Sequence, residues 1–551
     1  MFNFRQLLIL LSTYLLSISS PCFAQDPFKD ATIQGNLYTD IKCYIKDTPI
    51  DAEDAPEKVR TNAYGNILFR YRGFSAGIRY EAYQPPIMGY DSQYEGQGIA
   101  YRFMSYTDSL YSITLGNYYE QFGSGLILRS YEDKNLGIDN SIDGFRLFIR
   151  PTVGVSIKGI IGRQRNYWDW SPGIVRGVDA ELNLFDAFRK PANSTLLMGV
   201  SFVSRYQEDN DPIYKLPENV AAFAGRLSYY QGTFQVSGEY AYKVNDPSTA
   251  NNIIYKEGQA LVLSSSISGK GLGFLLSAKW IDNLDFRSAR GATGNALTMS
   301  YVPASFLQHT YNLPAMYPYA SQPLGEASIN GEISYRIPKE TILGGKYGTN
   351  IMISMAMANS IKKGVINDTT AIGESGTLGY KTAFLSIGDQ KYFRDFTVEI
   401  SRKFSRKLKS VLGFTDLFYN KSFIEGHPGE DDVYAWVIYG DISYRISESN
   451  NLRMELQHLQ TKQDRGSWAM MLIEYTIAPK WFVSVTDQYN YGNDSKDRRI
   501  HYLNLSLGYT KQSHRLNISW GRQREGVICT GGVCRKVPSS NGFGLTYSTT
   551  F

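Results

Sequence analysis

Hydrophobic and polar side chains alternate along most of the chain, in pairs of stretches separated by tight turns. Near the amino terminus, residues 66–71 and 74–82 alternate on either side of a turn at Arg72. Near the carboxyl terminus, residues 503–509 and 515–520 repeat this arrangement. A period of two places the hydrophobic set and the polar set on opposite faces of a strand. The pattern therefore predicts antiparallel hairpins that follow one another along the chain.

The final ten residues, 542–551, indicate what surrounds these strands. Larger and mostly hydrophobic residues alternate with small ones, Phe543, Leu545, Tyr547, Thr549 and Phe551 against Gly542, Gly544, Thr546, Ser548 and Thr550. Such a strand suits a barrel wall between lipid and a hydrated interior. An edge strand of a soluble sandwich would carry charge or proline as protection, and this stretch has neither. We expect the barrel assembly machinery to read Tyr547 and Phe551.

The connections between the alternating stretches are short and long in turn. Short turns are predicted at Arg72-Gly73, Thr107-Asp108, Arg150-Pro151, Gly269-Lys270, Ser405-Arg406, Ser447-Glu448, Ala478-Pro479 and Gln512-Ser513. Longer connections are predicted at residues 45–61, 85–95, 118–142, 164–173, 206–217, 244–257, 282–325, 360–391, 420–431, 491–499 and 524–540. Short periplasmic turns and long extracellular loops produce this alternation, so we predict a single all-β transmembrane antiparallel barrel of about 24 strands, within a range of roughly 22 to 26.

Residues 1–24 predict a cleaved secretory signal peptide. Arg5 precedes an apolar run over residues 7–18, and residues 22–24 form a small-x-small cleavage site. The apolar run is too short to remain as a membrane anchor. We therefore expect residues 25–551 to form a mature barrel embedded in the lipid of the outer membrane of a Gram-negative bacterium.

The composition agrees with a barrel and excludes other classes. The 41 Tyr, 28 Phe and 7 Trp residues suit aromatic girdles at the two membrane interfaces. After residue 24 no stretch approaches about 18 consecutive apolar residues, which excludes helical membrane spans. The net charge of +5 is small and its basic residues are scattered, so no nucleic-acid partner is predicted.

Several segments carry a resemblance to a known family. Residues 116–133 read GNYYEQFGSGLILRSYED and are followed by LGIDN; HTY stands at 309–311, YPY at 317–319 and GGVCR at 531–535. Together they resemble an uncharacterised family of large outer-membrane barrel proteins of Bacteroidota. The resemblance spans essentially the whole mature chain and implies the barrel fold. It implies no activity and no functional residues.

The first of these segments also supplies candidates for a constriction. Charged side chains predicted to line the lumen or to fold into it are Arg70, Arg79, Glu81, Glu120, Arg129, Glu132, Asp133 and Asp139. If residues 118–142 fold inwards they narrow the pore, as pore-lining charges do. Arg129 must then pair with Glu120, Glu132 or Glu81, because an unpaired buried charge costs several kcal/mol. The alternative is a solvated outer loop with incidental charges.

Cysteine spacing predicts one disulfide. Cys529 and Cys534 flank two glycines in the last long connection, and the chain is expected to pass through an oxidising compartment. A zinc site would need two further ligands, and no histidine lies nearby, so no metal is predicted. Cys43 is left unpaired.

Catalytic motifs are absent from the sequence. The histidines, which are His309, His427, His458, His501 and His514, stand in no hydrolase or metalloprotease motif, and no nucleotide-binding loop appears. We predict no cofactor and no enzyme, with a dispersed barrel-enzyme site as a minor alternative. Two functions remain. The favoured one is a loop-narrowed channel for small solutes. The other is a self-plugged structural subunit whose extracellular loops dock surface lipoproteins or secretion components.

Overall fold

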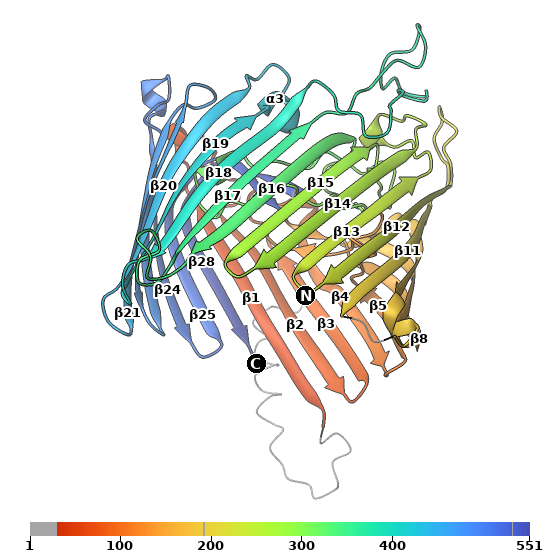
Figure 1. Ribbon diagram of the computed structural model, residues 1–551, viewed down its shortest axis with the longest axis horizontal. Helices are drawn as coiled ribbons and strands as arrows, with labels where there is room; N and C mark the ends of the chain where they lie inside the picture. The colour runs from red at the N-terminus through yellow and green to blue at the C-terminus, as the bar shows by residue number, and fades with distance from the viewer. Residues whose placement is uncertain (1–29, 191–192, 532) are drawn as a thin grey trace, which may run out of the picture.

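The computed structural model describes residues 30–190, 193–531 and 533–551, so the predicted signal peptide lies outside the described residues. Within them, 24 long strands form one antiparallel sheet. The first strand, β1 (Thr32–Tyr44), pairs with the last, β28 (Ser540–Thr550), and this pairing closes the sheet into a barrel. Figure 1 shows β1 beginning and β28 ending at the same rim. The predicted fold, an antiparallel transmembrane barrel with 24 strands, is confirmed.

Each wall strand pairs with the wall strands next to it in the sequence. In chain order the remaining wall strands are β2 (Val59–Tyr71), β3 (Phe74–Tyr83), β4 (Gly96–Thr107), β5 (Tyr111–Tyr118), β8 (Ile142–Thr152), β9 (Val155–Asn166), β10 (Asp169–Asn183), β11 (Ser194–Tyr206), β12 (Asn219–Gln231), β13 (Phe234–Lys243), β14 (Gly258–Gly269), β15 (Leu272–Asp282), β16 (Gly325–Ile337), β17 (Thr349–Asn359), β18 (Lys391–Lys403), β19 (Leu408–Tyr419), β20 (Val433–Arg445), β21 (Asn450–Thr461), β22 (Trp468–Ile477), β23 (Trp481–Tyr489), β24 (His501–Lys511) and β25 (His514–Gln523).

The remaining elements lie in the connections. Two short hairpins are formed by β6 (Glu132–Asp133) with β7 (Ile138–Asp139), and by β26 (Gly526–Thr530) with β27 (Val533–Val537). The helices are single turns, α2 (Leu184–Ala187) and α3 (Lys421–Ile424), with 3-10 turns at Thr48–Ile50, Ser92–Tyr94, Thr249–Asn251, Pro314–Met316 and Lys496–Arg498. In the part of the chain that the structure describes, no helix is both long and apolar enough to cross a membrane.

The connections follow the predicted alternation, with three differences. The turn expected at Arg150-Pro151 is wrong: a register shift between Ile149 and Thr152 lets β8 continue past the proline, and the chain reverses before Val155. The expected loop at 164–173 is instead a tight reversal between Asn166 and Asp169, because β9 and β10 pair up to their ends. Two periplasmic connections, residues 184–193 and 338–348, are longer than simple turns.

The outward face of the wall is apolar. Alternate residues on neighbouring strands, such as Val200 (65% exposed), Leu412 (57%) and Phe543 (53%), present large hydrophobic side chains to the surroundings. The opposite, inward face combines small, polar and charged residues with hydrophobic residues of two buried clusters. An apolar belt around a closed sheet is the surface that a membrane-spanning barrel presents to lipid.

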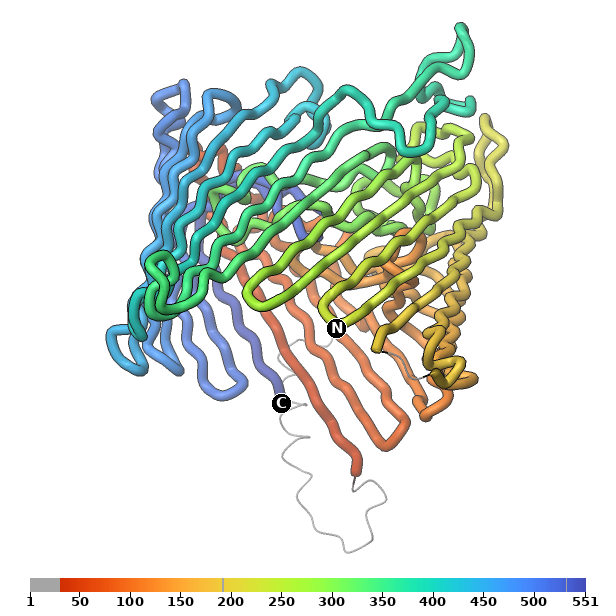
Figure 2. The backbone as a smooth tube through the Cα atoms, viewed as in Figure 1, coloured from red at the N-terminus to blue at the C-terminus, as the bar shows by residue number. Residues whose placement is uncertain are grey.

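Inward-folded loops fill the lumen. The connections at residues 119–141 and 283–324 lie inside the wall, as the tube in Figure 2 shows. They pack into two hydrophobic clusters, which we call the first interior core (residues between Tyr118 and Val302) and the second interior core (residues between Tyr311 and Tyr502, with Ile50 and Ala52). The barrel is therefore a plugged one rather than an open cylinder.

Candidate functional site

The connection at residues 119–141 contributes an apolar segment to the first interior core. Phe122, Leu126 and Leu128 are fully buried, and they pack with Phe286 and Met299 of the second inward connection. Main-chain hydrogen bonds join the two segments, since the N–H of Arg129 donates to Met299 and that of Tyr301 donates to Gly125. Of the two interpretations of the sequence, the inward fold is the one the structure adopts.

Six buried or partly buried charged side chains form a group beside this segment, which we call the mouth network: Arg79, Glu81, Glu132, Lys134, Asp139 and Arg165. Arg79 lies 2.7 Å from Glu81 and 2.9 Å from Glu132, and it also contacts Asp139. Arg165 lies 2.7 Å from both Glu81 and Asp139. The network ties β3 and β9 of the wall to the β6–β7 hairpin of the plug.

Asp139 occupies the centre of the mouth network. Burial opposes its ionisation, but Arg165 and Arg79 outweigh burial and hold the pKa of Asp139 below its ordinary value of 3.8. The hydroxyl of Tyr119 donates to the same carboxylate at 3.0 Å. Asp139 is therefore an ionised, fully coordinated carboxylate at neutral pH.

The three carboxylates of the mouth network, Glu81, Glu132 and Asp139, also lie close enough together to suggest a metal site. Their oxygens already contact Arg79, Arg165 and Lys134, so three cations balance three carboxylates. A divalent cation would have to displace these partners. The group is best described as an internal salt-bridge network.

The other predicted lumen residues have separate roles. Glu120 pairs with Arg146 at 2.6 Å and with Lys158 at 3.0 Å, both on the wall. The carboxylate of Asp133 accepts main-chain N–H groups of its own hairpin. Arg70 is exposed near the periplasmic end of β2 and forms no ion pair with any other described residue.

The expected carboxylate partner of Arg129 is a prediction that the structure contradicts. Its guanidinium lies over the rings of Tyr131 and Tyr301, with its central carbon 4.5 and 3.8 Å from their centroids. The carboxylates proposed for it are engaged elsewhere, in the mouth network and by the wall. Two aromatic faces can stabilise a desolvated guanidinium without a carboxylate.

The connection at residues 283–324 bridges the two interior cores. Its aromatic part packs on β18 to β21, where Tyr319 stacks on Phe393 and Tyr311 lies against Tyr439, with centroid separations of 5.1 and 4.3 Å. This connection joins β15 to β16, and Lys279 on β15 forms a fully buried ion pair of 3.0 Å with Glu326 on β16. The segment is anchored at both ends and on both sides of the lumen.

The β26–β27 hairpin lies against the plug, and it carries the predicted disulfide. Cys529 and Cys534 are cross-strand neighbours and are bonded, as expected, whereas Cys43 is a half-buried free cysteine on β1. The hairpin accepts hydrogen bonds from the plug, since Asn295 donates to the carbonyl of Cys534 at 2.7 Å and Tyr301 to that of Gly531 at 2.8 Å. The disulfide links the two strands of the hairpin, and these hydrogen bonds hold the hairpin against the inward loops.

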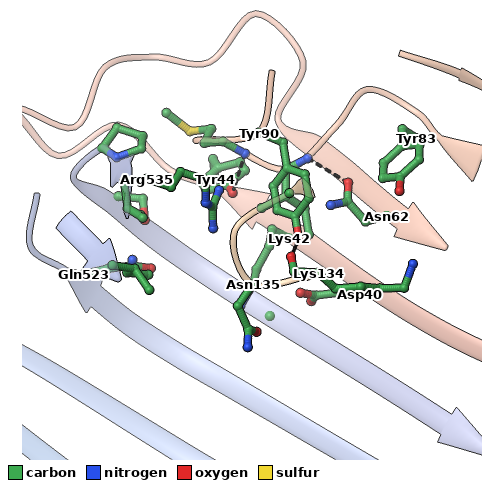
Figure 3. A pocket seen from close by; sticks show the side chains of 18 of the residues that line it. Asp40, Lys42, Tyr44, Asn62, Tyr83, Tyr90, Lys134, Asn135, Gln523 and Arg535 are labelled. Atoms are coloured by element: carbon green, nitrogen blue, oxygen red, sulfur yellow. Dashed lines mark hydrogen bonds between the residues drawn. The ribbon is translucent and has the colours of Figure 1, made fainter. Parts of the chain in front are cut away.

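Three adjoining cavities remain between these elements. A seam cavity of about 380 Å³ lies against β1, β28 and the β6–β7 hairpin (Figure 3). An outer cavity of about 480 Å³ shares Gly137, Asp139 and Arg535 with it, and a side cavity of about 430 Å³ shares Asn295 and Arg535 with the outer one. A fourth, periplasmic cavity of about 650 Å³ lies beneath the plug, between Gly123 and Glu332, and shares no lining residue with the other three.

The seam cavity is lined by tyrosines, amides and charges. Figure 3 shows Tyr44, Tyr83 and Tyr90 around it, and the hydroxyl of Tyr90 bonds the carbonyl of Lys134. Space on the β28 side is left by small residues: a Cβ at Gly544 would lie 2.8 Å from the Lys42 ammonium. The alternation had identified this small-residue face of the last strand, but not the cavity that it borders.

Replacing Asp139 with Asn is expected to lower the apparent unfolding temperature of the detergent-solubilised barrel by several degrees. The change leaves Arg79 and Arg165 with less negative charge, and breaking a buried ion pair costs about 3 to 5 kcal/mol. Because the folded-state pKa lies below the unfolded-state value, this stabilisation is present above pH 3.8 and is lost as the pH falls through the folded-state pKa. The measurement is thermal melting at pH 7 and pH 5, where the deficit should be equal.

The control for this prediction is Asp186→Asn in the α2 turn, where the exposed carboxylate accepts a hydrogen bond from Asn183. It should leave the melting temperature within about a degree of wild type, as surface changes do. If Asp139→Asn also melts like wild type, the mouth network does not hold the plug.

Comparisons with known proteins give a family and distant barrels. A family model described as a family of unknown function (DUF6029) matches residues 4–551. No curated protein matches the chain.

Solved structures with some similarity include three barrels. The translocation pore of the P pilus usher PapC has a TM-score of 0.41 and 10% identity, covering 94% of this chain and 99% of the usher chain. The siderophore receptor PirA from Pseudomonas aeruginosa has a TM-score of 0.40 and 9% identity, covering 94% and 80%. The outer membrane protein opdK from Pseudomonas aeruginosa has a TM-score of 0.31 and 10% identity, covering 72% and 97%. TM-scores this low identify neither the function nor the ligands of this chain.

Proposed function

We propose that this chain, which belongs to the family of unknown function DUF6029, is a loop-narrowed channel for small solutes in the outer membrane of a Gram-negative bacterium. The observation that carries the proposal is the chain of three adjoining cavities beside an otherwise packed plug. A purely structural plug has no need of connected polar space. Its location in the outer membrane is supported by the apolar outward belt and by the aromatic carboxyl-terminal strand.

The proposal extends to the processing, assembly and source of the protein and to the residues of its constriction. The signal peptide at residues 1–24 is removed, the assembly machinery recognises Tyr547 and Phe551, and the source is a member of the Bacteroidota. Arg79, Glu81, Glu120, Arg129, Glu132, Asp133 and Asp139 shape the constriction, and Arg70 faces the periplasmic vestibule. The channel works without catalysis, metal or cofactor.

A specific observation favours the structural alternative. The connection at residues 360–390 projects from the outer rim in Figure 1 and exposes several large hydrophobic side chains. Among them are Ile387 (65% exposed), Leu378 (62%) and Phe384 (51%). Exposed apolar groups of this kind suit docking to another protein, so a plugged subunit that binds surface lipoproteins or secretion components is the second candidate.

The channel is tested with purified full-length protein in planar bilayers and in swelling liposomes. We expect small, steady conductance, and swelling driven by small solutes such as glycine and ribose. A large oligosaccharide should drive none, because the plug leaves only narrow passages. Complete absence of both conductance and swelling, with a correctly folded barrel by circular dichroism, would favour the structural subunit.

A further inference from the structure

Arg535 occupies the junction of the three adjoining cavities. It lies on β27, directly after Cys534 of the disulfide, and lines the seam, the outer and the side cavity. Its guanidinium lies over the ring of Tyr90, 4.6 Å from the centroid. Figure 3 shows it at the edge of the seam cavity, on the side of Tyr44 and Tyr90. Among the residues that line these cavities, Arg535 is the one common to all three.

The guanidinium of Arg535 has donors without acceptors. Its Nε and Nη1 atoms are buried and have no hydrogen-bond partner among the described residues, and no described carboxylate lies within ion-pair distance. By contrast, the mouth-network arginines, Arg79 and Arg165, each contact at least two carboxylates. Buried polar groups are satisfied in nearly all proteins, and an exception points to a missing ion, water or ligand.

Arg535 forms no ion pair with another described residue, although Asp40 also lines the seam cavity. The nearby carboxylates Glu132 and Asp139 are already balanced within the mouth network. Burial lowers the pKa of Arg535, and Tyr90, Tyr44 and Asp133 offset this effect only in part. A second cation, Lys42, lines the seam cavity and forms no ion pair with another described residue.

We propose that Arg535 binds the carboxylate or phosphate group of a small hydroxylated solute in the seam cavity, which makes the passage selective for organic anions. This inference rests on the proposed channel function. A guanidinium donates charge-assisted hydrogen bonds to such oxyanions. The tyrosine faces and the amides of Asn62, Asn135 and Gln523, drawn in Figure 3, suit the ring and the hydroxyl groups of a sugar acid or sugar phosphate.

Binding is measured by isothermal titration calorimetry on the full-length protein in detergent, which does not require conduction. The probes are glucuronate, glucose 6-phosphate, inorganic phosphate and neutral glucose. We expect glucuronate and glucose 6-phosphate to bind at least about tenfold more tightly than glucose, because a hydrogen bond to a charged group contributes more than a neutral one. The stronger of the two identifies the oxyanion. Binding of inorganic phosphate alone would overturn the requirement for a hydroxylated solute.

Three variants test the residue itself. Arg535→Gln should weaken anion binding by about tenfold or more, whereas Arg535→Lys should keep the charge and most of the affinity. The matched control is Arg465→Gln, which also removes one positive charge from an outer connection but acts on an exposed arginine paired with Glu525. It should bind like wild type. Equal anion affinity in wild type and Arg535→Gln would overturn the proposal.

Failure of the channel and failure of the anion site give different results. Anion binding that depends on Arg535, in a barrel that never conducts, would keep the site and reject the channel. Conductance without Arg535-dependent binding would keep the channel and reject the site. Unchanged circular dichroism and thermal melting of Arg535→Gln would show that its loss of binding does not reflect misfolding.

Discussion

Deletion of residues 124–138 is expected to turn a poorly conducting barrel into a large and steady pore. The deletion removes Leu126, Leu128, most of the β6–β7 hairpin, and Glu132 and Lys134 of the mouth network, so the first interior core loses its centre. A 24-strand wall is wider than porin walls, whose lumen already holds an aqueous channel, so conductance should rise on the order of tenfold or more. Single-channel recording in planar bilayers measures this, and cells should become sensitive to bulky antibiotics.

The matched control is a deletion of residues 366–372 from the exposed part of the 360–390 connection, which contributes to neither interior core. Its conductance should equal that of wild type. Large conductance in both wild type and the 124–138 deletion would mean that the plug opens by itself in the bilayer. Silence in both would assign the seal to residues 283–324 and would favour the structural role.

Replacing Phe551 with Asp, or deleting it, is expected to abolish the folded barrel almost completely. The main chain of Phe551 exchanges two hydrogen bonds with Gly35, of 2.8 and 2.9 Å, and its ring occupies the space where a Cβ of Gly35 would lie. A carboxylate at this position would face lipid at the seam, and assembly would lose its terminal aromatic residue. Outer-membrane levels by immunoblot, with heat-modifiable migration as the folding test, provide the measurement.

Two controls accompany this prediction. Phe551→Tyr keeps the aromatic ring and should assemble normally. Phe404→Asp alters another exposed aromatic residue, 53% exposed in the turn between β18 and β19 and remote from the seam in sequence. It should lower the level of folded protein far less. Normal levels of the Phe551→Asp barrel would show that neither seam closure nor assembly depends on this residue.

Strand number and loop boundaries were predictable because every strand of a barrel wall follows the same rule, in which outward-facing and inward-facing residues alternate. The connections expected at 282–325 and 360–391 coincide with the gaps between β15 and β16 and between β17 and β18. The rule fails where strands leave the membrane. Strict alternation puts Arg165 in the same set as Ile161, which is 46% exposed, yet Arg165 is buried in the mouth network.

The contacts inside the lumen were not predictable in the same way. Glu120 and Glu132 were correctly considered as candidates for ion pairs. Alternation along a strand does not show which residues of other strands lie close to them, so it could not identify their partners. A carboxylate was expected for Arg129 because an unpaired buried charge is costly, whereas the rings of Tyr131 and Tyr301 take this role. Arg535 ends the GGVCR segment, but that segment implies no function, and only the place of the hairpin beside the cavities gives this residue significance.

The two interior cores have a consequence for the order in which the molecule forms. All residues of the first interior core lie between positions 118 and 302. Strands β5 to β15 can therefore pack around this core while the rest of the chain is still unpaired. The second core differs, because Ile50 and Ala52 meet partners as distant as Tyr502. That contact forms only when the two ends of the sheet meet. The packing of the second interior core is therefore completed only when the barrel closes.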